Sequence, residues 1–95
     1  FVSPKEAKDL ISRGALLFDV RTPEETADGH LPGAKLIDSR EAPSRINDFG
    51  DKEKPVVLYC KSGGRSGAVG TLLKQHGYKH VYNAGGYKEL KDSFQ

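Results

Sequence analysis

The stretch from residue 56 to residue 66 constrains the fold of this chain more than any other. An apolar, β-branched run, Val56–Tyr59, leads into Cys60, the only cysteine of the sequence. A short glycine-containing loop with two cations follows, and then an amphipathic pattern begins. This order predicts a buried strand, a tight loop and the N-terminus of a helix. A thiol at a strand tip, surrounded by backbone N–H groups, readily becomes a thiolate. The first hypothesis is that Cys60 is a nucleophile and that the loop behind it is an anion cradle.

Length and composition limit the classes of protein to which the chain can belong. Ninety-five residues predict one domain, residues 1–95, with a single core. A net charge of +2 with interspersed signs argues against a nucleic-acid partner. No apolar run approaches the length that crosses a membrane, so no membrane partner is expected. One cysteine excludes an internal disulfide and a cysteine-based metal site, and no metal or other cofactor is expected. Because the chain starts at Phe1, we expect a processed or trimmed product.

Helix and strand signals alternate along the chain. Two capping boxes, Ser3 with Glu6 and Thr22 with Glu25, each precede or include a proline at the first helical position. The patterns predict helices from Pro4 to about Gly14, from Pro23 to about Ala27, from Pro43 through Phe49, after Cys60 through Leu73 to Gly77, and from Tyr87 through Phe94. They predict strands at 15–20, 35–38, 56–60 and 80–84, with Gly85 and Gly86 turning the chain.

This alternation predicts an α/β fold. Apolar strands separated by helices are typical of a parallel sheet that is covered by helices on both faces. Ligands of such sheets bind beyond the carboxyl ends of the strands. Cys60 stands at one of these ends, directly before the loop.

Cys60 and its loop admit two interpretations. An isolated free cysteine is most often a small buried hydrophobe. Cys60, however, ends its strand, and Lys61 and Arg65 lie in the loop beside it. Loop N–H groups and a helix N-terminus would lower the pKa of its thiol. The candidate binding residues are the whole loop: Lys61, Ser62, Gly63, Gly64, Arg65 and Ser66.

Individual loop residues have alternative roles as well. Gly63 and Gly64 can satisfy a positive φ and also let the backbone approach a bound anion. The hydroxyl of Ser66 can donate to a ligand or cap the following helix, and the two roles are weighted equally.

Asp19, Arg21 and His30 are further candidates outside the loop. Asp19 could act as a general acid and His30 as a base. Attack by a thiolate, which has already lost its proton, needs little proton chemistry. The preferred interpretation therefore makes Asp19 and Arg21 an ion pair that holds the fold, with His30 packing and hydrogen-bonding within its loop.

Four motifs resemble those of a known family. They are Asp-Val-Arg-Thr-Pro-Glu-Glu at 19–25, Gly-His-Leu-Pro-Gly-Ala at 29–34, Tyr-Cys and its loop at 59–66, and Asn-Ala-Gly-Gly-Tyr at 83–87. Together and in this order, they resemble the single-domain rhodaneses, which are thiosulfate sulfurtransferases. The resemblance implies a central parallel sheet of four or five strands flanked by helices, and a cysteine at position 60 that forms a persulfide.

Loop length separates this family from phosphatases that share its fold. Residues 61 to 64 separate Cys60 from Arg65, whereas Cdc25-type phosphatases have one residue more, which makes the loop wide enough for phosphate. The shorter loop suits a single sulfur atom. Phosphatase or arsenate reductase activity is therefore the third hypothesis, behind a rhodanese-like sulfur carrier or partner-binding module.

The leading hypothesis is an enzyme that moves a sulfane sulfur. Cys60 would take sulfur from thiosulfate or a similar donor and pass it to cyanide or a thiol. Lys61 and Arg65 would attract the dianionic donor. The expected partners are small-molecule donors and acceptors, with a protein acceptor as an alternative. Both a cytoplasmic and an exported, periplasmic location fit the resemblance.

Overall fold

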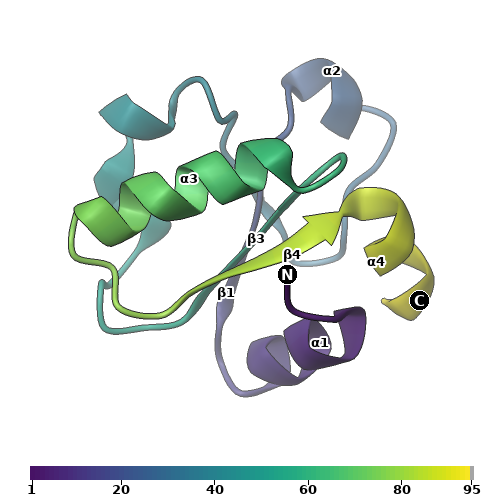
Figure 1. The fold of residues 1–95 in the computed structure, drawn as a ribbon. Helices are drawn as coiled ribbons and strands as arrows, with labels where there is room; N and C mark the ends of the chain where they lie inside the picture. The colour runs from purple at the N-terminus through teal and green to yellow at the C-terminus, as the bar shows by residue number, and fades with distance from the viewer. Residues whose placement is uncertain (95) are drawn as a thin grey trace.

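A computed structural model describes residues 1–94 of the chain (Figure 1). Helices and strands alternate from one end to the other, with two short 3₁₀ turns in the middle. In chain order the elements are α1 (Pro4–Ser12), β1 (Leu16–Asp19), α2 (Pro23–Thr26), β2 (Lys35–Leu36), η1 (Ala42–Ser44), η2 (Ile46–Phe49), β3 (Val56–Cys60), α3 (Gly64–Gln75), β4 (Val81–Gly86) and α4 (Tyr87–Ser93).

The strands form one sheet in the order β2-β1-β3-β4. All three pairings are parallel, and β3 lies between β1 and β4. The structure therefore confirms the α/β class with a parallel sheet. Of the two strand numbers expected, four is the one observed in the part of the chain described.

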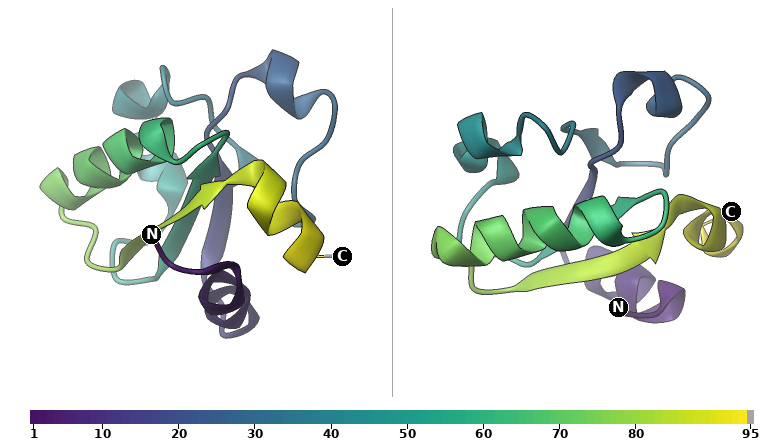
Figure 2. Two further views of the ribbon diagram at one scale, coloured as in Figure 1. Left: turned by 45° about the vertical axis from the view of Figure 1, so that its right-hand side comes forward. Right: turned by 45° about the horizontal axis from the view of Figure 1, so that its top comes forward.

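Side chains of β3 alternate between two hydrophobic clusters, one on each face of the sheet. Val56, Leu58 and Cys60 belong to the cluster that includes Val69 and Leu73 of α3. Val57 and Tyr59 belong to the cluster that contains residues of α1 and α4. Figure 2 shows α3 on one side of the sheet and α1 with α4 on the other. A central strand buried on both faces explains the continuous apolar run at 56–60.

The helix starts predicted from the capping boxes are confirmed. Ser3 Oγ accepts from the Glu6 N–H, and the Glu6 side chain accepts in return from the Ser3 N–H. Thr22 and Glu25 make the same reciprocal pair at the start of α2. Each box satisfies N–H groups that would otherwise lack a partner in the first turn.

Two predicted elements differ in the structure. The helix expected from Pro43 through Phe49 is replaced by η1 and η2, because this stretch is rich in turn-forming residues and Arg45 is its one strong helix former. The strand expected at 35–38 is reduced to the two residues of β2.

The turn expected at Gly85 and Gly86 is also wrong. Both glycines belong to β4, which extends to Gly86 opposite Cys60. The register between β3 and β4 shifts between Leu58 and Cys60, and Gly85 has a φ of +86°. A Cβ on Gly86 would lie 2.5 Å from the Lys61 carbonyl oxygen. These glycines therefore permit a close approach of β4 to the loop after Cys60.

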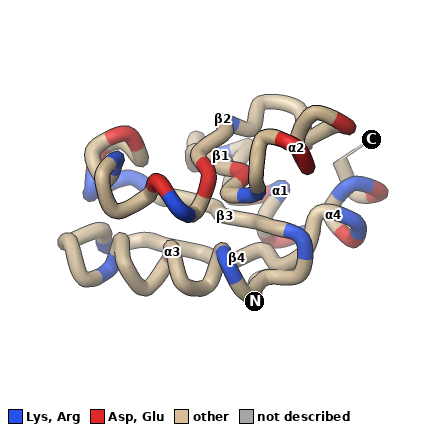
Figure 3. The backbone as a smooth tube through the Cα atoms, turned by 90° about the horizontal axis from the view of Figure 1, so that it is seen from above, with Lys and Arg blue, Asp and Glu red and all other residues tan. Residues whose placement is uncertain are grey.

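Charged positions are interspersed along the backbone, as Figure 3 shows. Acidic positions occur on α2, close in sequence to the carboxyl end of β1. Among residues 1–94, no helix has the length and apolar character needed to cross a membrane.

Candidate active site

Cys60 lies at the carboxyl end of β3, with its side chain on the α3 face of the sheet. The residue is 1% exposed. The next residues curl back so that the N–H of Gly63 donates a hydrogen bond to Cys60 Sγ at 3.0 Å. Gly63 has a φ of +98°, a conformation that favours glycine, and it precedes the first residue of α3. The loop therefore directs a backbone N–H group at the sulfur from the N-terminal end of α3.

The surroundings of Cys60 lower the pKa of its thiol. Burial alone would raise this pKa, because it disfavours the thiolate. The Ser66 side chain and the backbone N–H groups of Ser66, Ser62 and Gly63 stabilise the thiolate and outweigh burial. The N–H groups of a first helical turn have no partner within their helix, so they are available to donate hydrogen bonds to the sulfur.

Ser66 and Asn83 form a hydrogen-bonded group beside the sulfur. Ser66 Oγ lies 2.8 Å from Asn83 Oδ1 and 3.4 Å from Cys60 Sγ. Asn83 Nδ2 donates to the Gly63 carbonyl at 2.9 Å, which ties the loop to β4. Gly63, and not Ser66, occupies the N-cap position of α3. The capping role considered for Ser66 is therefore wrong, and its hydroxyl lies next to the thiol.

Arg65 is held by a carboxylate of another helix. Its two terminal nitrogens donate to the two carboxylate oxygens of Glu25 at 2.6 and 2.9 Å. The hydrogen bond from Arg65 is the largest cause that lowers the pKa of Glu25, to about 2, and hydrogen bonds from Thr22 act in the same direction, whereas burial opposes them. The sequence suggested two cations available to a ligand, but in the structure Arg65 is already paired with Glu25.

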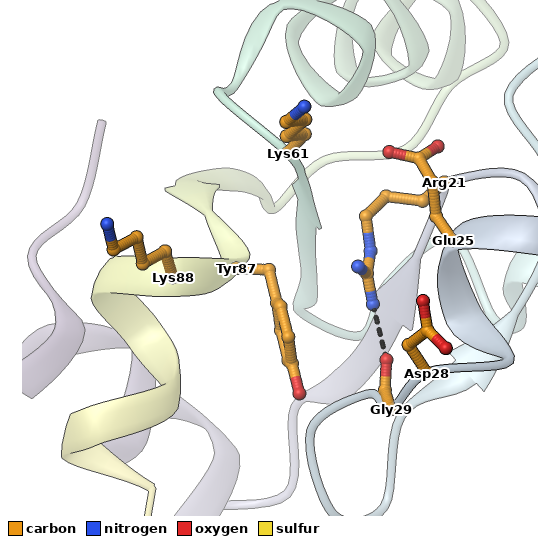
Figure 4. A pocket seen from close by; sticks show the side chains of 7 residues that line it. All are labelled: Arg21, Glu25, Asp28, Gly29, Lys61, Tyr87 and Lys88. Carbon is orange, nitrogen blue, oxygen red and sulfur yellow. Dashed lines mark hydrogen bonds between the residues drawn. The ribbon is translucent and has the colours of Figure 1, made fainter.

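Lys61 lines a cleft of about 300 Å³ beside the loop (Figure 4). The other lining residues come from two segments of the chain, 21–29 and 87–88: Arg21, Glu25, Asp28, Gly29, Tyr87 and Lys88. The Arg21 guanidinium carbon lies 4.2 Å from the centre of the Tyr87 ring, a cation–π contact. Lys61 is exposed, and among the residues described it has no carboxylate oxygen within 4.0 Å.

Asp19 and Arg21 form a buried ion pair. Arg21 Nη2 lies 2.6 Å from Asp19 Oδ2, and the same nitrogen donates to the Gly29 carbonyl at 2.8 Å. These contacts fasten the loop after α2 to the end of β1. His30 is exposed, and its Nδ1 hydrogen-bonds to the Leu31 carbonyl at 2.9 Å. Asp19 thus has the fold-holding partner that the preferred interpretation assigned to it.

Two residues of the site escaped the sequence reasoning. Glu25 is the partner of Thr22 in the capping box and the last residue of the motif at 19–25, and neither pattern reveals Arg65, 40 residues away. Asn83 was noticed only within a motif. Its position in a strand was a usable signal, because asparagine is depleted in strands and calls for a particular reason when it occurs there.

Comparison with known proteins places this arrangement in a family. The profile of the Rhodanese-like domain matches residues 3–93. The thiosulfate sulfurtransferase GlpE of Ectopseudomonas mendocina is 32% identical over 92 residues, which cover 94% of this chain and 81% of that protein. PspE of Escherichia coli, also named a thiosulfate sulfurtransferase, is 41% identical over 74 residues, or 77% of this chain and 71% of that protein.

A solved structure agrees with the sequence relatives. The human single-domain sulfurtransferase TSTD1 superposes with a TM-score of 0.86 and 31% identity, covering 96% of this chain and 94% of that one. The residues matched by the family profile, 3–93, include the whole sheet and the loop after β3. The chain therefore belongs to the rhodanese family of sulfurtransferases.

Proposed function

We propose that the protein transfers a sulfane sulfur through a persulfide on Cys60. The observation that carries the proposal is the hydrogen bond from the Gly63 N–H to Cys60 Sγ at 3.0 Å, at the carboxyl end of a parallel strand. The same loop N–H groups that lower the pKa of the thiol would stabilise a terminal sulfur anion. Relatives named thiosulfate sulfurtransferases make thiosulfate the first donor to test.

The reaction has two steps. The Cys60 thiolate attacks the outer sulfur of thiosulfate, a new S–S bond forms, and sulfite leaves with the electron pair of the broken S–S bond. A thiophilic acceptor, cyanide or a thiol, then attacks the outer sulfur of the persulfide and restores the thiolate. The exchange is balanced without an added oxidant or reductant.

The loop residues would divide the work of binding. The backbone N–H groups of Ser62, Gly63 and Ser66 would face the sulfur on Cys60. Lys61, exposed on the cleft, would attract an anionic donor. Gly64 is the first residue of α3, and Arg65, the second, forms an ion pair with Glu25.

The test is formation of thiocyanate from thiosulfate and cyanide. We expect steady formation by the native chain and none by Cys60→Ser, which replaces the sulfur with a smaller oxygen that cannot form a persulfide. Absence of thiocyanate with the native chain over a range of both substrates would contradict the proposal. Hydrolysis of an aryl phosphate that is lost in Cys60→Ser would instead indicate a phosphatase.

A further inference from the structure

The pairing of Glu25 with Arg65 changes the charge of the site. Glu25 lies in α2, which follows β1, and Arg65 lies in α3, which follows β3. Both helices start at carboxyl ends of adjacent parallel strands, so the pair joins two elements at the edge where Cys60 lies. The pair is bidentate, the geometry in which arginine binds carboxylates most strongly.

We propose that Glu25 is a specificity-determining residue that disfavours sulfur donors carrying two negative charges relative to donors carrying one. The inference rests on the proposed function and adds to it the charge class of the donor. Glu25 acts in two ways, and both make the electrostatic potential at the loop less positive. It offsets the positive charge of Arg65 beside the loop, and its own carboxylate lines the cleft next to Lys61.

The carboxylate of Glu25 is permanently charged at working pH. The hydrogen bond from Arg65 holds its pKa at about 2. A donor that approaches the loop therefore always meets a negative charge together with the cations. Coulomb energy scales with the product of the charges. A donor is therefore attracted less strongly here than beside an unpaired arginine, and the loss of attraction energy is larger for a dianion than for a monoanion.

Charge around the cleft is otherwise mixed. Lys61 and Lys88 line it, as does Asp28. Arg21 also lines it, but its guanidinium is bound to Asp19 and to the Gly29 carbonyl. With Arg65 paired as well, the positive potential toward a donor depends chiefly on the two lysines, and Glu25 opposes it.

The test compares two donors that differ by one charge. Thiosulfate is a dianion and releases sulfite. Benzenethiosulfonate is a monoanion, presents the same outer sulfur and releases benzenesulfinate. In Glu25→Gln, we expect the ratio of kcat/KM for thiosulfate to kcat/KM for benzenethiosulfonate to rise roughly three- to fivefold, the weight of one pair of unit charges a few ångströms apart in watery surroundings. Glutamine keeps the capping box with Thr22, so α2 retains its start.

Glu24 supplies a matched control. It is the preceding residue of the same first turn, it is exposed, and no ion pair is recorded for it among residues 1–94. Glu24→Gln changes the net charge by the same amount and leaves Arg65 paired. We expect the donor ratio of this variant to stay close to that of the native chain.

A second measurement needs no turnover. Alkylation of Cys60 by iodoacetate, an anion, and by iodoacetamide, which is neutral, reports the potential at the sulfur. We expect the iodoacetate-to-iodoacetamide rate ratio to rise in Glu25→Gln and not in Glu24→Gln. Equal changes with both reagents and both donors would show a purely structural role and overturn the inference. Failure of the native chain to use either donor would overturn the proposed function, whereas the alkylation ratio would still decide the role of Glu25.

Discussion

The Ser66 hydroxyl lies within hydrogen-bonding distance of Asn83 Oδ1, at 2.8 Å, while Cys60 Sγ lies 3.4 Å from the same hydroxyl oxygen. A hydroxyl has one hydrogen and can donate it to one of these acceptors at a time. Asn83 Oδ1 also accepts from the Gly85 N–H at 3.0 Å. The amide oxygen therefore keeps a donor when the Ser66 hydroxyl turns to the sulfur, and a thiolate on Cys60 gains this bond at little cost.

Ser66→Ala should raise the pKa of the Cys60 thiol. The hydroxyl is a leading cause that favours the thiolate, and alanine removes it while burial, which opposes the thiolate, remains. The rate of alkylation by iodoacetamide against pH measures the change, and its midpoint should move to higher pH. In Ser62→Ala the backbone N–H near the sulfur is kept, so the midpoint should stay where it is. An unshifted midpoint in Ser66→Ala would contradict this account of the thiolate.

Gly86→Ala should damage the loop, although the residue lies in β4. Its Cβ would stand 2.5 Å from the Lys61 carbonyl oxygen, so the strand and the loop would have to separate. We expect lower stability to urea and a large loss of sulfur transfer. Gly64→Ala is the comparison: apart from its chain neighbours and the backbone of its own helix, no heavy atom would lie within 4 Å of the new Cβ, and alanine is favoured by up to about 1 kcal/mol within a helix. Equal stability of the two variants would refute the close approach of β4.

Tyr59→Phe should destabilise the fold without touching the thiol. The Leu31 N–H donates to the Tyr59 hydroxyl at 2.9 Å, and both residues are buried. Phenylalanine leaves that N–H without a partner, which costs about 1–3 kcal/mol. Urea unfolding measures the loss. Tyr82→Phe, on the partly buried part of β4, provides the control, since no hydrogen bond is recorded for that hydroxyl within residues 1–94. A loss no greater than in the control would contradict the prediction.

Glu25 should also contribute to stability in a pH-dependent way. Its pKa is about 2 in the folded chain, below its ordinary value of 4.5. A carboxyl group whose pKa is lowered by folding stabilises the fold above its ordinary pKa, and this contribution is lost as the pH falls toward the folded value. Urea midpoints at about pH 6 and about pH 3 should therefore differ more in the native chain than in Glu25→Gln. The same difference in both proteins would mean that the ion pair contributes nothing measurable to stability.

Much of the fold could be predicted from local sequence signals. The continuous apolar run at 56–60 and the two capping boxes are short-range patterns with direct physical causes, and the structure contains the elements that they predict. The stretch at 43–49 shows the limit, because its spacing suited a helix while its residues form 3₁₀ turns. The hydroxyl oxygen of Tyr78, a residue distant in sequence, lies there 2.9 Å from the Ile46 carbonyl oxygen and 2.7 Å from the Gly50 carbonyl oxygen, and it can donate to one of them at a time.

The candidate site could be predicted only as far as its residues are adjacent in sequence. Cys60 and the loop through Ser66 form one continuous segment, so the strand, loop and helix order indicated them. The partners of that segment come from elsewhere: Glu25 from α2 and Asn83 from β4. No spacing rule connects residues so far apart in the chain. The sequence therefore predicts that Arg65 attracts the sulfur donor, whereas in the structure Arg65 is paired with the Glu25 carboxylate.

The most direct test of the central claim is the intact mass of the protein after incubation with thiosulfate alone. A persulfide adds one sulfur, so the mass should rise by about 32 Da on a single site, located at Cys60 by peptide mapping. Addition of cyanide should return the mass to its starting value, and Cys60→Ser should show no gain. A native chain whose mass stays unchanged with thiosulfate, or whose added sulfur maps to another residue, would contradict the account.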